Sequence, residues 1–230
     1  TQPNTLFPYT TLFRSGLLPL THGVHDNGID LDEAVGERGF AGSLGRAGYR
    51  THFIGKAHFS SNHSYGHRST GRCENIPSAP QVPTDWQGPY MGFERVEMMQ
   101  LGHNYWLPEA PPGGLHYERW YHADGLGQFK DGLYQAHWPR GRRAAQTHAS
   151  ELPQAWHNSQ WVGDRAVEMV RDHARRQRVG DGAPLCAWVS FADPHHHVQL
   201  HDHPRDTVLP PCPCPGGGRG RPAPGGPEGS

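Results

Sequence analysis

Apolar and small residues recur at helical spacing across residues 40–47, and a strand-like run follows them directly. The shared face consists of Phe40, Ala41, Leu44 and Ala47. Gly48, just beyond this face, is a typical helix stop. Upstream, Asp30 and Glu33 have the spacing of a capping box, which predicts that a helix begins near them. The run "YRTHFIG" predicts a strand that stops at Lys56.

The same order of helix and strand returns between residues 158 and 192. Asn158 or Ser159 is placed to cap a helix. Its inward face is predicted to comprise Val162, Ala166, Met169, Val170 and His173. After a polar turn, residues 184–192 ("PLCAWVSFA") are almost continuously apolar, which is typical of a strand covered on both faces. Two helix–strand units of this kind predict a parallel α/β architecture.

The stretches outside these two units show little hydrophobic period. Within residues 60–150, "MGFERVEMM" predicts one short strand, and we expect the rest to be long loop above the strand ends. From Pro210 onward, proline and glycine dominate, which predicts disorder. We therefore expect three segments. Residues 1–15 are foreign or disordered, 16–198 form the globular domain, and 199–230 are a histidine-containing and then Pro/Gly-rich disordered tail.

Charge and composition exclude several classes of function. The formal net charge of −1 gives no electrostatic reason to expect a nucleic-acid partner. No apolar run reaches the roughly 18 residues of a membrane span, so we expect no membrane partner. The chain begins without a signal-peptide pattern, and we expect the natural amino terminus to lie upstream. The four cysteines show neither a disulfide framework nor zinc spacing, and Cys186 is expected in the core.

Charged and imidazole side chains stand just past both predicted strands. Lys56 and His58 follow the first strand, and Asp193 precedes three histidines at 195–197 after the second. Ligands of open α/β sheets bind beyond the carboxyl ends of the strands. A lysine there would supply a point charge, and imidazoles hydrogen bonds or a proton, which suits a sulfate or phosphate group. The alternative is that these residues are solvated strand ends and loops.

Five segments also follow one another in a recognisable order. They are "LTHGVHDNG", "AGYRTHFIGKAHF", "GFERVE", "HNSQWVGDRAVEMV" and "WVSFADPHH". Over residues 15–196 the chain resembles the amino-terminal part of a sulfatase of the alkaline-phosphatase superfamily, particularly arylsulfatases and choline-sulfatase-like members. The resemblance implies a partial alkaline-phosphatase-like sandwich with a mostly parallel sheet, and a partial sulfatase catalytic domain at 16–198. It also implies hydrolysis of a small-molecule or carbohydrate sulfate ester.

The resemblance implies roles for individual residues. Lys56 matches the lysine that binds the sulfate and the nucleophile, and His58 matches the histidine that supports this nucleophile. His195 matches a histidine that contacts the sulfate and the leaving oxygen, which makes these three the candidate catalytic residues. Asn27 and His196 are the candidate substrate-binding residues. The implied cofactors are a formylglycine made from a cysteine and a divalent metal, commonly calcium.

Several positions depart from the family pattern. The cysteine that becomes formylglycine would fall at position 6, where Leu6 stands, and Thr10 replaces the arginine of the same motif. The segments that supply the metal ligands are missing, so we expect no metal site in this sequence. After His196 the family's Pro-Phe is replaced by His197-Val198. We therefore expect both ends to be foreign through truncation, frameshift or assembly error, and the chain as written to be inactive.

Three alternatives stay open. One is a phosphodiesterase or phosphonate hydrolase of the same superfamily, although Lys56 and His58 favour a sulfatase. Another is a non-catalytic histidine-rich metal-binding protein, in which His201, Asp202 and His203 would chelate a transition metal. The third is a chain that does not fold stably, because the sheet lacks strands.

Overall fold

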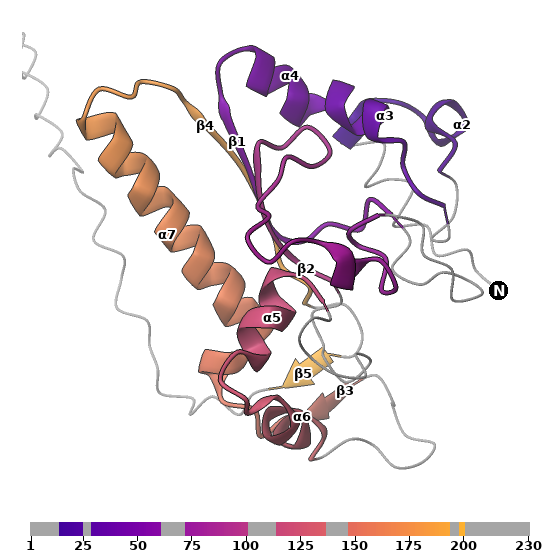
Figure 1. Ribbon diagram of the computed structural model, residues 1–230, viewed down its shortest axis with the longest axis vertical. Helices are drawn as coiled ribbons and strands as arrows, with labels where there is room; N and C mark the ends of the chain where they lie inside the picture. The colour runs from indigo at the N-terminus through magenta and orange to yellow at the C-terminus, as the bar shows by residue number, and fades with distance from the viewer. Residues whose placement is uncertain are drawn as a thin grey trace, which may run out of the picture. The chain divides into compact units, whose positions relative to one another are not determined.

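The computed structural model describes six stretches of the chain, with the backbone alone at 147–149 and 198–200. The six are residues 14–24, 29–60, 72–100, 114–136, 147–193 and 198–200. The chain divides into two compact units, 1–200 and 201–230, and every described residue belongs to the first. The elements of this unit (Figure 1) are α2 (Pro19–His22), α3 (Glu33–Arg38), α4 (Phe40–Arg46), β1 (Arg50–Lys56), η1 (Ala79–Gln81), β2 (Arg95–Met99), α5 (His116–His122), α6 (Gly127–Gln135), β3 (Thr147–Ala149), η3 (Gln154–Trp156), α7 (Asn158–Arg178), β4 (Leu185–Ser190) and β5 (Val198–Leu200).

Strands β2, β1 and β4 form a three-stranded sheet in that order, and both pairs are parallel. β1 is the central strand, with Gly55 opposite Met98 on one side and Ser190 on the other. Strands β3 and β5 pair separately, also in parallel. The predicted parallel α/β architecture and the short strand in "MGFERVEMM" are therefore confirmed.

Helices cover both faces of the three-stranded sheet. On one face Phe53 of β1 packs with Phe93 and with Phe40 of α4, whose ring centroid lies 5.8 Å from that of Phe93. On the other face Ile54 belongs to a second core, in which the rings of Tyr117 and Trp161 lie 5.5 Å apart. Adjacent strand residues point to opposite faces, so alternate positions of β1 serve different cores. The sheet is thus the middle layer between α3 and α4 on one side and α5 and α7 on the other (Figure 1).

The first helical unit is confirmed at its end and corrected at its start. Gly48 has a φ of 88°, and its N–H donates to the Gly45 carbonyl at 3.0 Å, so it ends the helix as predicted. The capping box from Asp30 to Glu33 is wrong. The helix begins at Glu33, and Asp32 caps it by accepting a hydrogen bond from the Ala34 N–H at 2.7 Å.

The second unit also shows corrections. The cap of α7 is His157, one residue before the predicted positions, because its Nδ1 accepts from the Ser159 N–H at 3.3 Å. Val170 was predicted on the inward face but is 54 % exposed. Trp161, which was not predicted there, is 4 % exposed and belongs to the core. β4 has Trp188 on one face and Val189 on the other, yet both stay partly exposed because β4 is an edge strand of this sheet.

Two helices stand where long loop was predicted, at residues 116–135. A buried lysine joins them, since Lys130 of α6 donates to the Tyr121 carbonyl of α5 at 2.6 Å and pairs with Asp124 at 2.8 Å. The Lys130 Nζ also lies 4.9 Å from the centre of the Trp156 ring, where a cation is attracted by the ring face. An amphipathic helix is recognised in a sequence by apolar residues at regular spacing. Where a polar residue such as Lys130 occupies a buried position, this regular spacing is interrupted.

Candidate functional site

The three parallel strands end at one edge of the sheet, and Lys56 is the last residue of the central strand. Lys56 lies opposite Met99 of β2, and Gly55 lies opposite Ser190, the last residue of β4. This is the edge at which open α/β sheets bind their ligands. The fold therefore places Lys56 between the ends of both neighbouring strands.

Gly55 permits this close arrangement. Its φ is 107°, a conformation that side-chain-bearing residues rarely adopt. A Cβ atom at this position would lie 1.9 Å from the Ser190 carbonyl oxygen, which is far inside van der Waals contact. Only glycine lets the ends of β1 and β4 approach each other beside Lys56.

Lys56 is a partly buried cation without a close counter-ion in the described part of the chain. Burial lowers the pKa of Lys56, and the carboxylates of Glu74 and Glu118 act in the opposite direction. Among the described residues, no carboxylate oxygen lies within 4.0 Å of its Nζ. Both nearby carboxylates instead accept hydrogen bonds from other donors, such as the Gln100 N–H to Glu118 at 2.8 Å. The ammonium group is therefore available to an anion at the sheet edge.

His58 follows two residues later and is also partly buried. Its φ of 57° places it in the left-handed region, which is uncommon for a residue with a side chain. The next N–H, of Phe59, donates to both oxygens of the Glu74 carboxylate at 3.0 and 3.1 Å, and the Tyr90 hydroxyl donates to it at 2.8 Å. Burial raises the pKa of Glu74 to about 7, although these hydrogen bonds lower it. Glu74 thus fixes the backbone beside Lys56 and His58.

Arg14 supports the same segment, a role that no sequence pattern indicated. Its Nη1 donates to the Ala57 carbonyl at 2.7 Å, and its guanidinium lies over the rings of Phe59 and Trp188 at 4.0 and 4.5 Å. Burial lowers the pKa of Arg14 to about 10, while the charge of Glu74 raises it. A lone arginine in "TLFRSG" has no spacing pattern that marks it as buried, and neither has Glu74.

The end of β4 is fastened to the start of α7 by three side chains. The Ser159 hydroxyl donates to Asp193 Oδ2 at 2.5 Å, and His157 Nδ1 lies 3.8 Å from the same oxygen. A serine nucleophile needs a histidine that accepts its proton. Here Ser159 donates to the carboxylate instead, and His157 Nδ1 accepts from a backbone N–H. The cluster therefore anchors the residues that precede the predicted histidines and does not form a catalytic triad.

Of the predicted site residues, the structure describes Lys56, the last residue of β1, and His58, two residues later. Asn27, His195 and His196 lie outside the described residues, as does Leu6. In the stretches that are described, no group of three or more His, Cys, Asp or Glu side chains is arranged to hold a metal ion. None of the described helices is long and apolar enough to span a membrane.

The chain matches no protein-family model and no curated protein.

Proposed function

We propose that this chain is a sulfatase-type protein and that Lys56 is its main sulfate-binding cation. The position of Lys56 carries the proposal: it ends the central parallel strand, is partly buried, and has no carboxylate within 4.0 Å among the described residues. A desolvated ammonium attracts an anion more strongly than one in bulk water does. The segment order that resembles sulfatases points to a sulfate ester as the ligand.

The proposal assigns each remaining residue a part in binding. His58 would donate to a sulfate oxygen from the turn that Glu74 and Arg14 hold in place. His195, His196 and Asn27 would complete the contacts to the sulfate ester. An alkaline-phosphatase-like arrangement of the whole domain is part of the same proposal.

Neither family cofactor fits position 6 and the described residues. Leu6 has no thiol from which formylglycine is made, and the described stretches offer no cluster of three suitable metal ligands. We therefore derive no hydrolytic step. The proposed role of the chain as written is to bind sulfate esters without cleaving them.

Titration calorimetry with sodium sulfate at constant ionic strength tests the proposal. A hydrogen bond to a charged group contributes about 1.5–3 kcal/mol, so Lys56→Met should weaken sulfate binding by about tenfold or more. Lys56→Arg keeps the charge and should retain most of the affinity. Arg171→Gln removes an exposed positive charge on α7 and serves as the control, with unchanged affinity. Sulfate binding that survives Lys56→Met, or no binding at all, contradicts the proposal.

The same titration separates the phosphonate-hydrolase alternative from the sulfatase. Methylphosphonate should bind more weakly than sulfate if Lys56 and His58 form a sulfate site. Tighter binding of methylphosphonate, lost again in Lys56→Met, would favour the alternative.

A further inference from the structure

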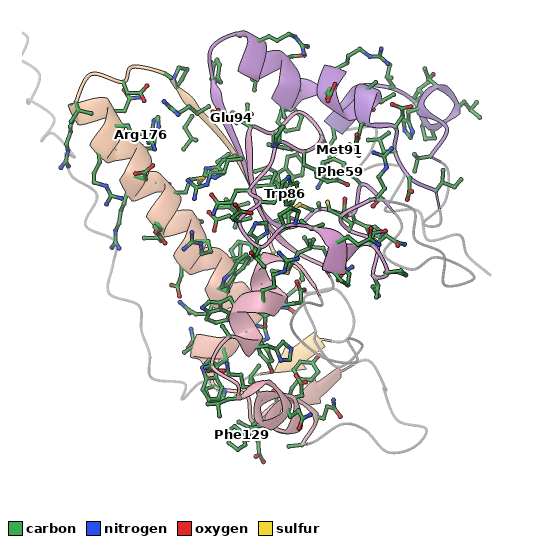
Figure 2. The ribbon with its side chains drawn as sticks, in the orientation of Figure 1. Phe59, Trp86, Met91, Glu94, Phe129 and Arg176 are labelled. Carbon is green, nitrogen blue, oxygen red and sulfur yellow. The ribbon has the colours of Figure 1, made fainter. Side chains whose placement is uncertain are left out.

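A cavity of about 240 Å³ lies at the opposite end of the sheet from Lys56. Its lining comes from the first residues of β1 and β2, the start of β4, and the middle and end of α7. Figure 2 labels two residues of this lining, Glu94 beside β2 and Arg176 on α7. Because the strands are parallel, their first residues share the edge remote from the proposed sulfate site.

Three of the four carboxylates around this cavity have arginine partners. Glu97 accepts a hydrogen bond from Arg165 Nε, and its other oxygen lies 3.6 Å from Arg95 Nη2. Asp172 accepts from Arg176 Nε at 2.8 Å and lies 3.5 Å from an Arg175 nitrogen. Glu168 accepts from Arg165 Nη1, which leaves Glu94 as the one carboxylate of this lining without an ion pair among the described residues.

Five arginines line the cavity with these four carboxylates, so guanidinium donors are in excess. The Arg95 side chain is 40 % exposed and makes no hydrogen bond among the described residues; its nearest anion there is the Glu97 oxygen at 3.6 Å. Arg50 uses one nitrogen, Nη2, for Asp181. The Nε atoms of Arg50 and Arg95, together with His52 Nε2, are buried without a hydrogen-bond partner in the described structure. Such unpartnered groups are uncommon in folded proteins and indicate that an acceptor is missing.

His52 adds a neutral hydrogen-bonding group to this set. Burial, followed by the charge of Arg95, lowers the pKa of His52 to about 4, so its ring is uncharged at pH 7. A neutral imidazole carries one N–H and one acceptor nitrogen. Two apolar side chains, Met169 and Leu185, also line the cavity. The lining thus combines guanidinium donors with a small apolar surface.

We propose that this cavity binds a small organic anion. Its carboxylate or phosphoryl oxygens accept hydrogen bonds from Arg95 and Arg50, and its apolar part packs against Met169 and Leu185. Guanidinium groups match the geometry of both oxyanions. The volume falls below the range of about 300–1,000 Å³ for drug-sized ligands, which suits a single ring or a short chain. The site does not depend on the proposed sulfatase function, since it shares no residue with that site.

Titration calorimetry with phenyl phosphate, benzoate and inorganic phosphate tests the inference. Wild-type protein should bind phenyl phosphate or benzoate more tightly than inorganic phosphate, because only the first two have an apolar part. The comparison between them identifies the oxyanion. Arg95→Gln should weaken binding by about tenfold or more, since a charge-assisted hydrogen bond is lost.

Two controls locate the site. Arg171→Gln removes a charge from the same helix outside the cavity, and Lys56→Met removes the cation at the other end of the sheet; both should leave the affinity unchanged. If Arg95→Gln does not fold, Arg50→Gln replaces it with the same expected loss. The inference is overturned if neither organic anion binds at about 10 mM, if Arg171→Gln weakens binding as much as Arg95→Gln, or if Lys56→Met alone abolishes it.

Discussion

Replacing Gly55 by alanine is the most direct test of the strand arrangement that places Lys56. Gly55 has a φ of 107° and lies opposite Ser190 in the register of β1 and β4. An alanine Cβ would meet the Ser190 carbonyl oxygen at 1.9 Å. Since this oxygen belongs to the backbone, no side-chain rotation relieves the clash, and the two strands have to separate.

The size of the effect follows from two contributions. Holding a residue with a side chain in a sparsely populated backbone conformation costs about 1–3 kcal/mol. Separating the strand ends adds the loss of packing and of parallel hydrogen bonds, and we expect Gly55→Ala to lower the free energy of unfolding by about 3–5 kcal/mol in total. This is a large share of the roughly 5–15 kcal/mol that stabilises an ordinary domain.

Urea unfolding followed by circular dichroism measures the effect, and Gly163→Ala is the matched control. Gly163 lies inside α7, and no heavy atom lies within 4 Å of an added Cβ. The same substitution should therefore stabilise the protein by up to about 1 kcal/mol, because alanine is the better helix former. A loss below about 1 kcal/mol in Gly55→Ala would show that Gly55 does not face Ser190. Lys56 would then not lie beside the end of β4.

Three further predictions concern the titration of Glu74, the cleavage of sulfate esters and the binding of zinc. Burial raises the pKa of Glu74 to about 7 from 4.5, so the stability this carboxyl contributes below pH 4.5 is lost as the pH rises through 7. The expected fall in the free energy of unfolding is up to about 3 kcal/mol, and Glu74→Gln should abolish it. Urea unfolding at a series of pH values between about 5 and 9 measures this free energy for both proteins. The wild-type chain should not hydrolyse 4-nitrophenyl sulfate, because Leu6 cannot become formylglycine; turnover abolished by Lys56→Met would contradict this. Zinc calorimetry should show no tight stoichiometric site, and one lost only in a His201→Ala, His203→Ala double variant would favour the metal-binding alternative.

The elements that could be predicted from the sequence are those in which burial follows hydrophobicity. β1 has apolar residues at Phe53 and Ile54 that enter the two cores, so its pattern and its structure agree. In α5 and α6 the agreement fails, because Glu118 and Lys130 are among the most deeply buried residues. Specific hydrogen bonds stabilise each of these two side chains. Such bonds cannot be predicted from the spacing of apolar residues.

In the candidate site too, some features could be predicted from the sequence and others could not. The position of Lys56 at the end of a strand could be predicted from a local segment, because the strand pattern stops there in the sequence. The support behind it could not, since Arg14 contacts Ala57 across 43 residues and Glu74 contacts Phe59 from a different stretch of chain. A buried charge is tolerated only where the fold supplies donors or counter-charges, and these partners are set by tertiary structure.

A single register of β1 fixes both proposed sites. His52 lines the cavity beneath α7, Ile54 belongs to the core on the same face, and Lys56 ends the strand. A slip of one residue would turn these three positions to the opposite face and place Phe53 against α7. Because Gly55 holds β1 against β4 at one point, a variant that shifts this register should lose the anion cavity and the sulfate site together. A variant that merely removes Lys56 or Arg95 should lose only one of them, and this difference separates a disturbed strand from a disturbed site.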